Sequence, residues 1–153
     1  LHIEDDYIIA SGSDAGEIKI WDMRNPVESW CVIWIKEHTD QISGMDVNSQ
    51  KTMLLSSSID GYLGVYDLRK EAKERLYAMS DNFEEDLTGV CILKQGRVVA
   101  VPSQEGVINL FWWDYFGDCN DRITGHPSSI DSFVKFDENL LITACEDGLI
   151  RVV

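Results

Sequence analysis

Short apolar stretches separated by turn residues make up most of the chain. They are rich in β-branched and aromatic residues, and Gly, Asp, Asn or Ser stands at their ends, which is typical of β-strands joined by turns. Only "RKEAKERLYAM" could be helical, and a loop that leads into a strand explains it equally well. The pattern predicts an all-β fold. The expected strands are "YIIASG", "IKIW", "SWCVIWI", "MLLSSS", "LGVYDL", "VCIL", "RVVAV", "VINLF", "NLLITAC" and "LIRVV".

Four of these regions repeat one pattern around a glycine. In "IASGSDAGEIKIWD", "LSSSIDGYLGVYD", "AVPSQEGVINLFW" and "ITACEDGLIRVV", a first strand is followed by a polar stretch, a glycine and a second, alternating strand. The glycines are Gly16, Gly61, Gly106 and Gly148, at spacings of 45, 45 and 42 residues. Glycine tolerates the positive φ that a tight turn between strands requires. A regular period of this length predicts repeated units that stack on one another.

Aromatic residues follow the repeated glycines at a fixed distance. Trp21-Asp22 and Tyr66-Asp67 begin five residues after their glycines, and the third repeat has Phe111 at that position. An aromatic side chain at the same point of each unit suggests the same packing role in each. An aromatic residue followed by Asp is a known signature of repeats that are built from four strands each.

Histidines precede two of the glycines by a similar distance. His38 stands 23 residues before Gly61, and the pair Gly125-His126 places its histidine 22 residues before Gly148. Together with the glycine period and the aromatic-Asp pairs, these positions resemble the WD-repeat β-propeller family over nearly the whole chain.

The resemblance implies blades of four strands each. The chain then holds about three and a half four-stranded blades of a larger ring, for which we expect seven blades. We expect one partial propeller domain over 1–153, with blade segments at about 1–36, 37–81, 82–124 and 125–153. The first blade is expected to begin at its second strand, and the chain to be a fragment of a longer protein.

The same resemblance implies a buried hydrogen-bonded network within the second repeat. In the family, a histidine, a hydroxyl on the second strand, the turn Asp and an aromatic ring meet there, and such a network specifies a unique core when it is satisfied. The residues expected in these positions are His38, Ser57, Asp60 and Tyr66, with His126 and Asp147 in the matching places of the fourth repeat.

The chain is strongly acidic, with 13 Lys and Arg against 27 Asp and Glu and a net charge of −14. Such a surface repels nucleic-acid phosphates, so we expect basic protein partners and no direct contact with nucleic acid. The cysteines form no C-x-x-C pair, no catalytic or phosphate-binding motif occurs, and no apolar run is long enough to span a membrane. We therefore expect a non-enzymatic protein of a reducing compartment, with no cofactor, metal, membrane segment or small-molecule substrate.

The segment Ile8 to Arg24 carries candidate contact residues. It resembles the box by which some WD-repeat proteins dock onto the adaptor subunit of cullin-4 ubiquitin ligases, which ends in apolar-Trp-Asp-x-Arg. Asp22 and Arg24 would contact the adaptor, and Arg69 stands in a near-match in which Tyr replaces Trp. An exposed Arg offers several donors to an acidic partner. An ordinary solvated Arg, or one bound within its own blade, is the alternative explanation.

The stretch "FWWDYFGDCND" lengthens the connection after the third strand of the third repeat. Trp113, Tyr115 and Phe116 are candidate partner contacts, because aromatic side chains anchor protein interfaces. The alternative is that they fold back and cover the edge of the blade. The carboxylates of this stretch lack the spacing of a calcium loop.

Leu87 to Asp131 resembles one branch of the WD-repeat family more closely, through an "LT-V" start, "EG-I-LF-W", "FG", "DR" and "SID". Proteins of that branch are nuclear and nucleolar and are implicated in ribosomal RNA processing and large-subunit biogenesis, and plant members are linked to the cullin-4 adaptor. The resemblance implies a scaffold for basic ribosomal proteins or assembly factors. A substrate receptor of a cullin-4 ligase is the alternative. Pro102 and Trp112 depart from the pattern of the branch.

Overall fold

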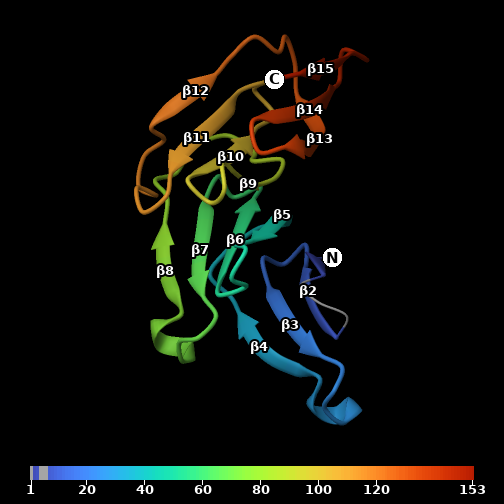
Figure 1. Ribbon diagram of the computed structural model, residues 1–153, viewed down its shortest axis with the longest axis vertical. Helices are drawn as coiled ribbons and strands as arrows, with labels where there is room; N and C mark the ends of the chain where they lie inside the picture. Colours follow the sequence, from blue (N-terminus) through green and yellow to red (C-terminus); the bar gives the residue numbers. More distant parts are fainter. Residues whose placement is uncertain (1, 4–6) are drawn as a thin grey trace.

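Four antiparallel sheets follow one another along the chain in the computed structural model, which describes residues 2–3 and 7–153 (Figure 1). In each sheet the strands pair in chain order, and no α-helix occurs among the described residues. The first sheet contains β1 (His2–Ile3), β2 (Ile8–Gly12), β3 (Ile18–Asp22) and β4 (Cys31–Ile35). The second contains β5 (Ile42–Val47), β6 (Met53–Ser58), β7 (Leu63–Asp67) and β8 (Leu76–Met79). The third contains β9 (Cys91–Leu93), β10 (Val98–Pro102), β11 (Ile108–Trp112) and β12 (Asp121–Ile123), and the fourth contains β13 (Ile130–Asp137), β14 (Leu140–Cys145) and β15 (Ile150–Val152).

The arrangement confirms the predicted all-β WD-repeat propeller fold, with consecutive sheets as blades. Strand β5 contacts β9, and β9 contacts β13, so the first strands of neighbouring sheets lie together and the later strands spread outward (Figure 1). Two details differ from the expectation. The short strand β1 precedes the strand at which the first blade was expected to begin. The stretch that could have been helical forms a single 3₁₀ turn, Ala72–Glu74, and then strand β8.

The repeated glycines all occupy the left-handed region of the backbone, as the period predicts. Their φ angles are 74° at Gly16, 83° at Gly61, 75° at Gly106 and 78° at Gly148. Each of them lies in the turn between the second and third strands of its sheet. At this point a Cβ atom would make the backbone conformation unfavourable, which explains why the residue recurs.

The core consists of layers between neighbouring sheets, and strand alternation assigns each side chain to one layer. Leu54 packs toward the first sheet, whereas its neighbour Leu55 packs toward the third. In the third sheet, Val99 packs toward the second sheet and Ala100 toward the fourth. Successive side chains of a strand point to opposite faces, so the central strands are apolar on both sides. Each inner sheet is thus held from two sides.

Candidate functional site

The Asp and Arg of the candidate docking box form an ion pair with each other at the end of β3. Asp22 Oδ1 accepts hydrogen bonds from the backbone N–H of Arg24 at 3.0 Å and from its Nε at 2.8 Å, and Asp22 Oδ2 lies 2.6 Å from Arg24 Nη2. The Arg24 side chain holds the pKa of Asp22 below its usual value. Arg24 remains 54% exposed, so both interpretations of this residue retain support: it is bound within its own blade and it faces solvent.

The same ion pair recurs at the end of β7. Asp67 Oδ1 lies 2.8 Å from Arg69 Nε and Asp67 Oδ2 lies 2.7 Å from Arg69 Nη2, and the Arg69 side chain is 65% exposed. Its hydrogen bonds lower the pKa of Asp67 to about 2, so this carboxylate stays ionised at any physiological pH. A planar guanidinium held by two parallel contacts to one carboxylate has a fixed orientation, and both groups remain more than half exposed at the end of the third strand.

The third sheet has an aromatic loop in place of the ion pair, and its three candidate residues differ in exposure. Tyr115 is 68% exposed and Trp113 is half-buried. Phe116 is 3% exposed and lies in the core between the second and third sheets, with its ring 5.4 Å from that of Trp113 in an edge-to-face arrangement. The prediction that Phe116 contacts a partner is therefore wrong, because the loop folds back and buries this ring, as the alternative explanation proposed.

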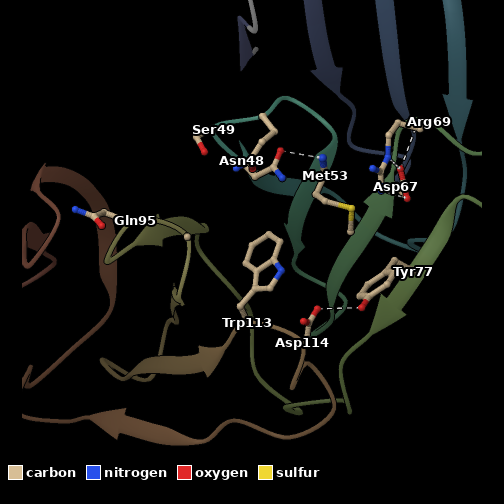
Figure 2. A pocket seen from close by; sticks show the side chains of 11 residues that line it. Asn48, Ser49, Met53, Asp67, Arg69, Tyr77, Gln95, Trp113 and Asp114 are labelled. Atoms are coloured by element: carbon tan, nitrogen blue, oxygen red, sulfur yellow. Dashed lines mark hydrogen bonds and ion pairs between the residues drawn. The ribbon is translucent and has the colours of Figure 1, made fainter.

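A pocket of about 390 Å³ lies between the second and third sheets at this end of the strands (Figure 2). We call it the interblade pocket. The indole of Trp113 stands among its lining residues, and beside it the Tyr77 hydroxyl donates a hydrogen bond of 2.9 Å to Asp114 Oδ1. Tyr77 and Asp114 had no sequence motif to indicate them. The pocket is lined by Asn48, Ser49, Gln50, Met53, Asp67, Arg69, Tyr77, Gln95, Gly96, Trp113 and Asp114.

The predicted buried network exists in the second sheet, with one residue changed. His38 Nδ1 lies 3.0 Å from Asp60 Oδ2, and His38 Nε2 lies 2.7 Å from the hydroxyl of Ser56. A carboxylate can only accept, so Nδ1 carries the proton and Nε2 accepts from the serine. Ser57 was the wrong choice, because it lies on the opposite face of β6 and its hydroxyl pairs with that of Ser43 at 2.9 Å.

Tyr66 lies where the resemblance placed it, beside this network. Its side chain is fully buried, and burial raises the pKa of its hydroxyl, which the neighbouring Ser56 opposes only in part. The ring passes close to the backbone two residues earlier in the same strand, where a glycine is required, since a Cβ on Gly64 would clash with the Tyr66 hydroxyl. Gly64 and Tyr66 thus form a matched pair on β7.

The fourth sheet keeps only half of the expected network. His126 Nε2 lies 3.0 Å from the hydroxyl of Thr143, which matches the contact of His38 with Ser56. Asp147 makes no hydrogen bond to His126 and instead forms an ion pair with Arg151, at 2.5 Å between Oδ2 and Nη2. The expectation that Asp147 joins a buried network with His126 is therefore wrong, because an arginine on β15 competes for its carboxylate.

Comparison with known proteins places these features in a family. The family model "WD domain, G-beta repeat" matches residues 29–67 and 117–153. Sequences named WD repeat-containing protein 55 are similar along the whole chain: that of Arabidopsis thaliana is 40% identical over 146 residues, which are 95% of this chain and 40% of the relative. Those of Bos taurus and Homo sapiens are 37% and 36% identical over 153 residues, which are 100% of this chain and 38% of each relative. The chain belongs to the WD-repeat family.

WD repeats form interaction surfaces for other proteins, so the family places this chain in a class of scaffolds that are generally not enzymes. The chain spans about two fifths of the length of the relatives it matches. Within the part that the structure describes, no three His, Cys, Asp or Glu side chains come together as metal ligands. No helix there is long and apolar enough to cross a membrane.

One WD repeat of the chain, the third, replaces the histidine network with other polar groups that the sequence analysis missed. Asn109 is fully buried and its Nδ2 lies 3.4 Å from Glu85 Oε1. Asn109 follows Gly106 by the same interval by which Gly64 follows Gly61, so alignment on the turn glycines could have indicated it. In this repeat a buried amide stands at the strand position that Gly64 occupies in the second.

The histidine network of the second WD repeat predicts a loss of stability in mild acid. Burial lowers the pKa of His38, against the opposing charges of Asp60 and Glu37, so the folded protein binds a proton less readily than the unfolded chain. The contribution of His38 is complete above its unfolded pKa of about 6.5 and is lost as the pH falls from there toward the folded value. Chemical unfolding between about pH 7.5 and 5.5 should show this decline, and His38→Gln should flatten it. An equal slope in the variant would contradict the assignment.

Proposed function

We propose that the protein is a non-enzymatic WD-repeat scaffold of the nucleus and nucleolus that takes part in ribosomal RNA processing and large-subunit assembly. Its partners in this role are basic ribosomal proteins or assembly factors. The observation that carries the proposal is similarity along the whole chain to WD repeat-containing protein 55, the branch whose motifs stand in Leu87 to Asp131.

The charge of the chain supports a protein partner over RNA. A net charge of −14 disfavours approach to a phosphate backbone and favours approach to the basic surfaces of ribosomal proteins. The polar residues of the structure are also engaged in structural roles: His38 is held by Asp60 and Ser56, and the Arg side chains at the strand ends are held by their own Asp residues. These observations support a rigid surface that acts by binding.

Depletion of the full-length protein from its source cells tests this function. Pulse labelling of RNA should show precursors of the large-subunit rRNA accumulating and the mature species declining, and expression of the wild-type protein should restore them. Normal maturation after depletion would overturn the proposal. Restoration by an Arg24→Ala variant would show that the role does not depend on the docking box.

Recruitment to a cullin-4 ubiquitin ligase is a second candidate function, and the recurrent Asp–Arg pair favours it. Arg24 follows β3 and Arg69 follows β7, and these strands run in the same direction in neighbouring sheets (Figure 1). Two exposed guanidinium groups therefore lie at the same end of adjacent blades. An acidic loop of an adaptor could pair with both.

Removing these arginines separates the two candidates. In the ligase hypothesis, Arg24→Ala should abolish co-purification of the adaptor with the full-length protein, and Arg69→Ala should reduce it. The matched control is Lys70→Ala, which removes one positive charge beside Arg69 without touching a strand-end pair. Quantitative mass spectrometry of the captured complexes measures the effect. Unchanged adaptor recovery with both arginine variants would exclude docking through these residues.

A further inference from the structure

We propose that the interblade pocket binds the guanidinium group of an arginine side chain presented by a partner protein. The inference rests on the proposed scaffold function and adds to it the chemistry of one contact. It is carried by Trp113 and Asp114, by the polar walls of the pocket and by the acidic charge of the chain.

The walls of the interblade pocket are held in place by backbone hydrogen bonds. On the side of the second sheet, Asn48 Oδ1 accepts from the backbone N–H groups of Thr52 at 2.8 Å and Met53 at 3.0 Å, which fixes the β5–β6 turn. On the side of the third sheet, the N–H of Trp113 donates to the carbonyl of Arg97 at 2.9 Å. A site built on such fixed turns loses little conformational entropy when a ligand binds.

Trp113 and Asp114 offer the two contacts that a guanidinium uses best. A guanidinium stacks on an aromatic face, and its N–H groups pair with a carboxylate. Asp114 Oδ1 accepts from the Tyr77 hydroxyl, whereas Asp114 Oδ2 has no hydrogen-bond partner among the described residues. The hydrogen bond from Tyr77 holds the carboxylate in the pocket that the indole also lines (Figure 2).

The charges around the pocket favour a cation. Arg69 is the one cationic residue that lines it, and Asp67 neutralises this group through two parallel contacts of 2.8 and 2.7 Å. Asp114 therefore leaves the lining with a net negative charge. A carboxylate of a partner would face Asp67, Asp114 and the overall charge of −14, so an acidic ligand is disfavoured.

The pocket has the size and polarity for a side chain of this kind. Its volume of about 390 Å³ exceeds that of one side chain, so a neighbouring segment of the partner's backbone can enter with it. The side-chain amide of Gln50, which also lines the pocket, offers a carbonyl oxygen for a remaining N–H group. An apolar ligand would cover Asp114 Oδ2 without giving it a hydrogen-bond partner, which costs free energy.

Binding of short peptides to the full-length protein tests the inference. The probes are a Gly/Ser peptide with one central arginine, the same peptide with citrulline, which has the same shape without the charge, and the same peptide with lysine. The measurement is the chemical shift of the Trp113 indole N–H, assigned by its loss in Trp113→Phe. The arginine peptide should give a saturable shift. Citrulline should bind about tenfold more weakly, since a charged hydrogen bond contributes about 1.5–3 kcal/mol.

Asp114→Asn is the informative variant and Asp118→Asn is its matched control. Asp114 has a φ of 72°, and Asn tolerates this conformation, so the variant removes the charge and keeps the backbone. Asp118 is exposed in the same loop and does not line the pocket. We expect Asp114→Asn to weaken the arginine peptide about tenfold and Asp118→Asn to leave it within about twofold. Unchanged positions of the other indole signals would show that both variants are folded.

Three results would overturn the inference: no shift with the arginine peptide, equal weakening by both variants, or equal binding of the arginine and citrulline peptides. Equal binding of lysine would overturn its restriction to guanidinium. Each is distinguishable from failure of the scaffold proposal, because capture of pre-ribosomal particles is measured separately. If those particles are recovered and the arginine peptide does not bind, this inference falls and the scaffold function stands.

Discussion

Replacing Gly106 by alanine is expected to lower the free energy of unfolding by about 4 kcal/mol, from a strained backbone and an overpacked contact together. Gly106 has a φ of 75°, which an alanine adopts only with strain. An added Cβ would also lie 2.7 Å from the carbonyl oxygens of both His126 and Ser128 in the neighbouring repeat. Backbone atoms cannot rotate away, so the two blades would have to separate. Chemical unfolding of the full-length protein measures the loss.

Gly96→Ala is the matched control for this prediction. Gly96 also has a positive φ, of 86°, but a Cβ there meets no atom within 4 Å. The variant therefore carries the conformational cost alone, about 1–2 kcal/mol. Equal destabilisation by the two changes would show that the turn glycines serve the backbone conformation only and that contact between the blades at Gly106 contributes nothing.

Asp60→Ala is expected to have the second large effect, a loss of about 3 kcal/mol. Asp60 accepts hydrogen bonds from the backbone N–H groups of Thr39 at 2.8 Å and Tyr62 at 3.1 Å and faces the buried His38. Its removal leaves the buried Nδ1–H of His38 without an acceptor and takes the acceptor from the N–H groups of Thr39 and Tyr62. Chemical unfolding of the full-length protein should show the loss. The dependence of the free energy of unfolding on pH, which is assigned to His38, should also change in this variant.

Asp147→Ala provides the comparison, since Asp147 stands before Gly148 as Asp60 stands before Gly61. Its carboxylate pairs with Arg151 near the surface and caps the N–H of Leu149 at 3.0 Å, where water can replace it. We expect a much smaller loss of stability than for Asp60. A loss as large as that of Asp60→Ala would mean that the two turns have equivalent networks, contrary to the structure.

Glycine spacing and strand alternation were sufficient to predict an all-β fold of repeated units, because both act locally, and the resemblance to WD repeats supplied the propeller. A positive φ at Gly16, Gly61, Gly106 and Gly148 is a property of the turn itself, and the period follows from repetition of that turn. Burial of the central strands on both faces follows from their apolar runs. The turn conformation and the burial of the central strands depend little on contacts between segments that are far apart in the sequence.

The errors concern side chains whose role depends on contacts between distant segments. Ser56 and Ser57 look equivalent in "LLSSS", and only the side of β6 that faces His38 distinguishes them. That side could have been inferred from alternation, because Ser56 shares its face with Leu54, which packs beside Tyr66. A shift of one residue along a strand reverses every side chain, and this reversal accounts for the choice of Ser57.

The sequence left two fates open for the aromatic loop, contact with a partner or folding back over the edge of the blade. Phe116 is buried because the loop returns to the second sheet, where the carbonyl of Gly117 accepts a hydrogen bond of 2.8 Å from the N–H of Asp81. Nothing in "FWWDYFGDCND" specifies that return. The same path places Trp113 and Asp114 in the interblade pocket, so the residues of the further inference became visible only in the fold.

Affinity capture of the tagged full-length protein from its source cells, with quantitative mass spectrometry, tests the central claim most directly. The claim is that this WD-repeat chain belongs to a scaffold of large-subunit assembly. The account predicts enrichment of large-subunit precursor particles, with basic ribosomal proteins and assembly factors among them, and no loss of this enrichment in Arg24→Ala. Recovery of a cullin-4 adaptor without pre-ribosomal particles, abolished by Arg24→Ala, would contradict it.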